Sequence, residues 1–218
     1  PTSTDLVIED KLGAALDRAK PEVIVDYAHY SAAADHAEQA TRRGVSFVFG
    51  MTGISDADVR TIRMSCRETG VPGMIVPNFA IGAVLMMRFA EMAAKWIPDC
   101  EVIEMHHDRK EDAPSGTAMM TAQRIGAART RDATRLPRPT LKVEGARGGV
   151  SNGVPVHSVR LPGLLAHQMV MFGSPGELLT LRHDSLDRAG FMNGVKLCVQ
   201  RVRSLDGLTI GMDRLLFE

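Results

Sequence analysis

The sequence predicts an α/β protein with a Rossmann-like parallel sheet, followed by an α+β domain with an open mixed sheet. In the first half of the chain, short apolar runs rich in β-branched residues alternate with helical patterns, which is typical of βαβ units. After residue 100, strand candidates follow one another without helices between them, which favours antiparallel or mixed pairing. A chain of 218 residues is long enough for two such domains.

The strands expected in the first half are residues 22–26, 45–49 and 73–76. Helical patterns cover residues 31–43 and 55–69, and Ser55 with the acids that follow it is a suitable N-cap. Residues 82–96 form a further, methionine-rich helix. We expect its methionines in the core rather than around a cofactor, because the flexible thioether fills irregular gaps between packed elements.

The second half is expected to begin with a strand over residues 100–105 and a helix over residues 115–129. A loop rich in Arg and Pro follows over residues 130–139. Pro-Gly and Ser-Pro-Gly turns then separate three strand candidates, residues 154–161, 166–172 and 177–183. A final helix over residues 187–203 leads to a short tail.

Composition excludes several classes of protein. The 26 basic and 26 acidic residues balance, so the basic excess of a nucleic-acid-binding protein is missing. The longest apolar runs, such as residues 81–87, are too short to span a bilayer, and residues 1–20 lack the pattern of a signal peptide. The three cysteines are widely spaced, which indicates reduced thiols. We therefore expect a soluble, cytoplasmic protein that binds neither nucleic acid nor membrane.

The segment with the clearest chemistry runs from the end of a predicted strand, through a polar loop, into a predicted helix. His106 and His107 offer imidazoles that titrate near neutral pH, and Lys110 adds a positive charge close by. Residues 115–117, Ser-Gly-Thr, open the helix, where backbone N–H groups and a partial positive charge favour an anion. The pattern indicates a site that holds a carboxylate and delivers a proton beside it.

Two other interpretations of the histidine pair stay open at this point. Adjacent histidines in a loop are common at protein surfaces without any function. A metal site also uses His and Asp, but no other His or Cys cluster has a recognisable ligand spacing, so we expect no metal.

The whole string His-His-x-x-Lys-x-Asp-Ala-Pro-Ser-Gly-Thr-Ala, which begins at His106, is similar to the signature of dihydrodipicolinate reductases. The resemblance extends over nearly the whole chain. Gly50-Met-Thr-Gly53 resembles the family's Gly-Thr-Thr-Gly loop, and residues 76–82 resemble the hinge between its cofactor and substrate domains. Residues 157–168 and 181–188 resemble strands of the substrate domain.

The resemblance implies NAD(P)H-dependent reduction of 4-hydroxy-tetrahydrodipicolinate, a cyclic dicarboxylate imine of the diaminopimelate and lysine pathway. NADPH or NADH would be the cofactor, and the enzyme would be a homotetramer. Residues 1–79 and 189–218 would be the remainder of the dinucleotide-binding domain, and residues 80–188 the substrate-binding and tetramerisation domain.

The resemblance also implies roles for individual residues. His106 would be the general acid/base and Lys110 a second proton donor. The substrate carboxylates would be bound by three residues, His107, Gly116 and Thr117. The nicotinamide and its ribose would be lined by Gly50, Met51, Thr52, Val76, Pro77, Asn78 and Phe79.

The chain departs from the family pattern at three places, one of which is residues 26–29, Asp-Tyr-Ala-His, where the family usually has Asp-Phe-Thr/Ser-x-Pro. The family begins with a strand and a Gly-x-x-Gly-x-Met-Gly turn for the cofactor pyrophosphate, and the printed sequence contains no such turn. We therefore expect the first βαβ to be missing. Met51 replaces the first Thr of the Gly-Thr-Thr-Gly loop, which removes a hydroxyl. Two alternative functions follow: a non-catalytic fragment or assembly module that cannot hold the cofactor, and a different reductase on the same architecture, such as an amino-acid dehydrogenase.

Overall fold

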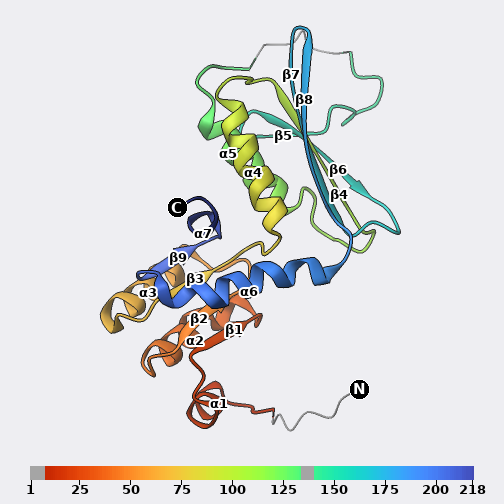
Figure 1. Cartoon of the computed structure of the whole chain (residues 1–218). Coiled ribbons are helices and arrows are strands. Elements are labelled where there is room, and N and C mark those ends of the chain that lie inside the picture. Colours follow the sequence, from red (N-terminus) through yellow and green to blue (C-terminus); the bar gives the residue numbers. More distant parts are fainter. Residues whose placement is uncertain (1–7, 134–139) are drawn as a thin grey trace. The chain divides into compact units, whose positions relative to one another are not determined.

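A computed structural model describes residues 8–133 and 140–218 of the chain (Figure 1). These residues group into two units. One comprises the described residues up to Phe79 together with Met192–Glu218, and the other is Ala80–Phe191. The first unit contains a parallel sheet and the second a mixed sheet, so the predicted fold class is confirmed.

The sheet of the first unit has the order β1-β2-β3-β9, and every described pairing in it is parallel. Its strands are β1 (Val23–Asp26), β2 (Ser46–Phe49), β3 (Gly73–Ile75) and β9 (Leu208–Ile210). All residues of β2 are buried, as expected for a strand that is covered on both faces. The three strands predicted in this half of the chain are therefore present.

The helical segments of this unit are α1 (Leu12–Ala19), η1 (Tyr30–Ala32), α2 (Ala33–Thr41), α3 (Asp56–Thr69), α6 (Met192–Arg201), η3 (Val202–Ser204) and α7 (Asp213–Phe217). The Ser55 hydroxyl accepts a hydrogen bond from the Asp58 N–H, which confirms the predicted N-cap of α3. Small residues of α2 and the apolar face of α3 pack on Phe47 and Phe49 of β2 and form the core on one side of the sheet.

The carboxyl-terminal prediction was partly wrong. The expected tail contains β9, which extends the sheet beside β3 through backbone bonds from the Gly73 N–H to the Gly207 carbonyl and from the Gly211 N–H to the Ile75 carbonyl. A strand of three residues is too short to show a period, and backbone pairing rather than side-chain pattern stabilises it. The expected helix over residues 187–203 is divided into η2, α6 and η3.

The sheet of the second unit has the order β5-β6-β4-β7-β8. Its strands are β4 (Cys100–His106), β5 (Gly149–Ser151), β6 (Val154–Arg160), β7 (Ala166–Ser174) and β8 (Glu177–Ser185). The central strand β4 is parallel to β6 and antiparallel to β7, and the other described pairs are antiparallel. The prediction of a mixed sheet is confirmed, whereas the short strand β5 was not predicted.

The helices of the second unit, α4 (Ile81–Ala94) and α5 (Gly116–Ala128), lie side by side over one face of this sheet (Figure 1). The 3-10 segment η2 (Arg188–Phe191) ends the unit. Alanines of both helices pack on Val102 of β4 and Phe172 of β7. Met86 and Met87 are buried as predicted, but Met92 is 53% exposed, so the expectation of a core role was wrong for that residue.

The described residues contain no helix with the length and apolarity that a bilayer crossing requires. The three cysteines lie in the described ranges, and each is a buried free thiol.

Gly194 of α6 is expected to be essential for packing in the first unit. A Cβ at this position would lie 2.0 Å from the Phe79 carbonyl oxygen, and a backbone atom cannot move aside as a flexible side chain can. Gly194→Ala should therefore lower the free energy of unfolding by about 1–3 kcal/mol, although alanine is normally the better helix former. Urea denaturation measures this change. Gly190→Ala is the control, because a Cβ there meets open space, and it should stay within about 0.5 kcal/mol of wild type.

Candidate active site

The carboxyl end of β4 places two functional side chains on one face of the sheet. Alternate residues of a strand point the same way, so Glu104 and His106 lie on the same side as the core residues Cys100 and Val102. The Glu104 side chain is completely buried, whereas the His106 side chain retains 15% of its exposure. His106 Nδ1 lies 2.5 Å from Glu104 Oε2. The buried carboxylate therefore holds the histidine at Nδ1, while part of the ring remains exposed to solvent.

Arg160 neutralises Glu104 from the neighbouring parallel strand β6. Its two terminal nitrogens bind the two carboxylate oxygens at 2.8 and 3.0 Å, and one of them also donates to the Asp112 carbonyl at 2.7 Å. Burial on its own would raise the pKa of Glu104. The hydrogen bonds from His106, Arg160 and Ser158 together outweigh burial and lower this pKa to about 2, so the carboxylate is ionised.

The same carboxylate also touches the beginning of α5. The Ser115 N–H donates to Glu104 Oε1 at 3.3 Å, and the Ser115 hydroxyl caps the helix by accepting from the Ala118 N–H. Gly116, the first residue of α5, has open space where a Cβ would stand. A helix start of this kind presents backbone N–H groups and partial positive charge, and here the absence of a side chain leaves room for an anion.

The loop between β4 and α5 contributes the other predicted residues. The Lys110 ammonium group forms an ion pair with Asp112 at 2.6 Å, and the backbone N–H of Lys110 donates to the His107 carbonyl. His107 Nδ1 is shielded from solvent and has no hydrogen-bond partner in the described part of the chain. A contact between His107 and a ligand therefore has to use the other ring nitrogen, Nε2.

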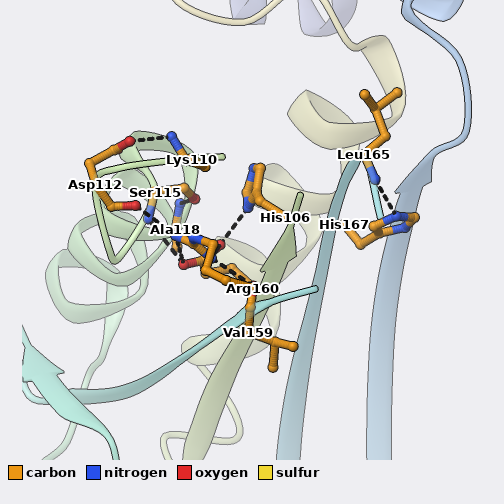
Figure 2. A network of polar contacts seen from close by, with 10 residues as sticks. His106, Lys110, Asp112, Ser115, Ala118, Val159, Arg160, Leu165 and His167 are labelled. Carbon is orange, nitrogen blue, oxygen red and sulfur yellow. Dashed lines mark hydrogen bonds and ion pairs between the residues drawn. The ribbon is translucent and has the colours of Figure 1, made fainter. Parts of the chain in front are cut away.

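The predicted catalytic and substrate residues thus belong to one continuous segment, residues 106–117, folded over the end of β4 (Figure 2). Chemically, the arrangement combines a histidine held on a carboxylate, a lysine, and a helix start without a side chain. It can bind an anion and transfer a proton next to it.

The sequence analysis did not predict the functions of Glu104 and Arg160. In the structure the Arg160 guanidinium binds Glu104. The signal for Glu104 was an acidic residue at an inward-facing position of a strand. It could have been found by asking which partner makes its burial tolerable.

His157 and His167 have structural partners outside the segment over residues 106–117. His157 bonds Glu101 across the other face of β4 and β6. His167 bonds Asp184 and accepts from the Leu165 N–H. Figure 2 shows His167 and Leu165 apart from the His106 network.

The residues predicted for the nicotinamide lie at the carboxyl ends of parallel strands in the first unit. Gly50 follows β2, and a Cβ there would stand 2.1 Å from the Tyr27 ring and 2.9 Å from the Phe79 ring. Only glycine fits between these two rings, which lie 5.8 Å apart. The Met51 side chain is buried in the core of the unit, so this residue keeps only its backbone for a ligand. Thr52 is exposed.

The other residues predicted for the nicotinamide follow β3. Val76 is fully buried and donates its N–H to the Phe49 carbonyl, Phe79 is buried, Asn78 is half-buried and Pro77 is exposed. No group of three or more His, Cys, Asp or Glu side chains within the described ranges is close enough to hold a metal ion.

Arg160 should contribute to stability in a pH-dependent way. With a pKa of about 2 in the folded state against 4.5 without partners, ionised Glu104 stabilises the fold fully above about pH 4.5, and this contribution is lost as the pH falls toward 2. Arg160→Met leaves the carboxylate buried without its cation, so we expect a loss of about 3–5 kcal/mol near neutral pH. The difference from wild type should shrink on acidification, because a protonated Glu104 no longer needs a cation.

Urea denaturation over a pH series measures that difference. Arg147→Met is the matched control. Arg147 pairs with Glu101, which lies on β4 as Glu104 does but near the surface, where an ion pair contributes about 1 kcal/mol or less. An Arg160 variant as stable as the Arg147 variant at every pH would contradict this role of Arg160.

Comparison with known proteins identifies the family. The model of the dihydrodipicolinate reductase N-terminus matches residues 2–79, and that of the dihydrodipicolinate reductase C-terminus matches residues 82–216. The 4-hydroxy-tetrahydrodipicolinate reductase of Lysinibacillus sphaericus is 45% identical over 216 residues, which are 99% of this chain and 82% of the relative. The corresponding reductase of Bacillus subtilis is 44% identical over 99% of this chain and 81% of the relative.

A solved structure agrees with these relatives. The dipicolinate-bound dihydrodipicolinate reductase from Paenisporosarcina sp. TG-14 superposes with a TM-score of 0.90 and 41% identity, over 99% of this chain and 81% of that one. The chain thus spans about four fifths of the length of these relatives. With both family models and relatives of this similarity covering nearly all of its residues, the chain belongs to the dihydrodipicolinate reductase family.

Proposed function

We propose that this chain reduces 4-hydroxy-tetrahydrodipicolinate with NADH or NADPH by using His106 as the proton donor and the start of α5 as the carboxylate site. The reaction is that of its 4-hydroxy-tetrahydrodipicolinate reductase relatives, whose similarity favours the reductase over a non-catalytic module. The observation that carries the residue assignment is the double contact of the buried Glu104, which holds His106 through one oxygen and accepts from the Ser115 N–H, next to the open position at Gly116, through the other.

The proton chemistry follows from the substrate. Hydride addition to a conjugated imine leaves an enamine-like anion, which has to be protonated to complete the reduction. His106 suits this step because imidazole exchanges protons near neutral pH and its ring remains partly exposed at the end of β4. Lys110, on the adjacent loop, is the second proton donor in this proposal.

The substrate carries two carboxylates, and the segment offers two kinds of anion partner. Gly116 and Thr117 at the start of α5 would bind one carboxylate through backbone and hydroxyl groups. His107 and Lys110 would bind the other through charge and hydrogen bonds. The solved relative that contains dipicolinate, a planar analogue with the same pair of carboxylates, supports a dicarboxylate as the ligand.

The residues present in the first unit fit the nicotinamide end of the cofactor. Gly50, Met51 and Thr52 after β2, and Val76 to Phe79 after β3, stand at the strand ends where open α/β sheets bind nucleotides. The Tyr27 and Phe79 rings occupy the space that a Gly50 side chain would need, so Gly50 would contribute its backbone to the ligand. When bound, the reduced nicotinamide supplies the hydride. The chain's own residues would hold it and keep a dry surface around it.

The roles of the two parts follow from these sites. We assign cofactor binding to residues 1–79 and 189–218, and substrate binding with tetramer assembly to residues 80–188. The edge strand β8 exposes Leu178 and Leu179, and exposed apolar sheet edges in proteins are normally covered. We propose that they are covered in a homotetramer, and that the enzyme works in the cytoplasm.

The role of His106 predicts a specific kinetic change. His106→Gln should lower kcat about 100-fold or more, because a positioned acid of this kind contributes roughly that factor. Binding of pyridine-2,6-dicarboxylate, measured by calorimetry with NADH or NADPH present, should stay near wild type. His157→Gln is the matched control, because His157 also bonds a glutamate of β4 but on the opposite face. Equal kcat values for the two variants would refute the assignment.

The cofactor proposal is tested by titrating wild type with NADH and with NADPH in the presence of pyridine-2,6-dicarboxylate. Binding and turnover with either nucleotide would support the reductase. Binding of the dicarboxylate without binding of either nucleotide would instead support the non-catalytic alternative.

The assembly proposal predicts that a charge on β8 separates the subunits. Leu178→Lys should convert the tetramer into smaller species in analytical ultracentrifugation, because a buried, unpaired ammonium group is costly. Met64→Lys, at a similarly exposed position on α3, should leave the sedimentation unchanged. A monomeric wild type would refute the proposal.

A further inference from the structure

Glu104 is a completely buried carboxylate in the site, and its burial calls for an explanation. A buried ion pair is often no more stable than apolar residues of similar volume, so stability alone does not account for Glu104 and Arg160. Gln168, the register partner of Glu104 on β7, is also buried, and its side-chain amide donates to the buried Thr121 hydroxyl at 2.7 Å. The part of the sheet that packs against the start of α5 is therefore polar, whereas the rest of the sheet face that α4 and α5 cover is apolar.

The contact between Glu104 and His106 determines which ring nitrogen carries the proton. An ionised carboxylate only accepts hydrogen bonds, so His106 Nδ1 is the donor across the 2.5 Å contact. In the neutral ring the unprotonated nitrogen is then Nε2, and in the imidazolium Nε2 carries the second proton. Glu104 thus fixes the tautomer and, at the same time, limits rotation of the ring.

We propose that Glu104 is the positioning residue of His106, which it holds with Nε2 as the only nitrogen that exchanges a proton with the substrate. The inference deepens the proposed function and rests on the role given there to His106. Glu104 touches neither substrate nor cofactor in this proposal, because it is covered by His106, Arg160 and the start of α5.

The proton transfer balances as follows. The Nε2–H bond of the imidazolium breaks, its electron pair stays on the ring nitrogen, and a C–H bond forms at the enamine-like carbon of the reduced substrate. The neutral imidazole that remains keeps its Nδ1–H on Glu104, so it is left in the tautomer that can accept the next proton from water. Without Glu104 the neutral ring could also carry its proton on Nε2, and in that tautomer Nε2 cannot accept the next proton.

The charges around His106 support an orienting role rather than direct proton transfer through Glu104. Arg160 from β6 binds both oxygens of the carboxylate, and Lys110 is paired with Asp112 on the adjacent loop. The hydrogen bonds that lower the pKa of Glu104 to about 2 keep it from taking the His106 proton. The Ser115 N–H on Oε1 connects the same carboxylate to the helix start that would bind a substrate carboxylate.

The first test compares two isosteric variants. Glu104→Gln should lower kcat about 100-fold, with a much smaller change in KM, because the His106 ring loses the acceptor that orients it. Glu101→Gln should behave as wild type, since Glu101 bonds His157 on the opposite face of β4. A Glu104→Gln enzyme with the kcat of wild type would overturn the proposal.

The second test separates positioning from a general effect on structure. If Glu104 acts through His106, adding Glu104→Gln to the His106→Gln enzyme should lower kcat by less than threefold, because the two changes remove one function. A further drop as large as in the wild-type background would overturn the proposal. Glu104→Asp keeps the buried charge beside Arg160 and withdraws it from His106, so it serves if the glutamine variant does not fold. Glu104→Asp should also lower kcat.

The third measurement needs no variant that might unfold. The ¹⁵N chemical shifts of His106 in the wild-type protein, assigned by their loss in His106→Gln, should show a proton on Nδ1 in the neutral ring. A neutral ring with its proton on Nε2 would contradict the inference while leaving the reductase activity untouched. Loss of activity in His106→Gln together with a normal Glu104→Gln enzyme would likewise overturn the inference alone. A wild type without reductase activity would instead overturn the proposed function.

Discussion

Burying a carboxylate costs several kcal/mol unless protein groups replace the lost water, and Glu104 is wholly buried between β4 and the start of α5. Its partners come from three separate places: His106 on its own strand, Arg160 on β6 and the Ser115 N–H at the helix start. None of the three can move far without leaving part of the charge unsatisfied. The histidine and the anion site are therefore positioned by one requirement, and the loop that connects them has little freedom to separate them.

Both units place their candidate residues by the same topological rule. The carboxyl ends of parallel strands meet at one edge of a sheet, and the loops that leave them converge there. In the first unit this brings Tyr27, Gly50 and Phe79 into contact after β1, β2 and β3. In the second unit β4 and β6 are parallel neighbours, so His106 and Arg160 are register partners at their shared end. Among the described pairs of the mixed sheet, β4 and β6 are the parallel one, and the candidate site lies at their carboxyl ends.

Much of this could be predicted from sequence because it depends on local patterns. Apolar runs predicted the longer strands, and Ser55 and Ser115 predicted the starts of α3 and α5. The histidine, lysine and helix-start residues were found because they follow one another along the chain. Glu104, Arg160 and β9 could not be interpreted in the same way. The functions of the two side chains depend on a pairing 56 residues apart, and β9 is held by backbone bonds that have no side-chain pattern.

Arg160 also explains how Glu104 can hold His106 without retaining its proton. A buried carboxylate with an imidazolium as its sole partner would attract the positive charge strongly, and the ring would release its proton reluctantly. Here the guanidinium, which cannot lose its charge, occupies both carboxylate oxygens, and the Ser115 N–H shares one of them. The negative charge is divided among several donors, so the attraction left for His106 is reduced while the hydrogen bond that orients its ring is kept. The site therefore requires the arginine for chemistry as well as for stability, and neither member of the Glu104–Arg160 pair has its full effect without the other.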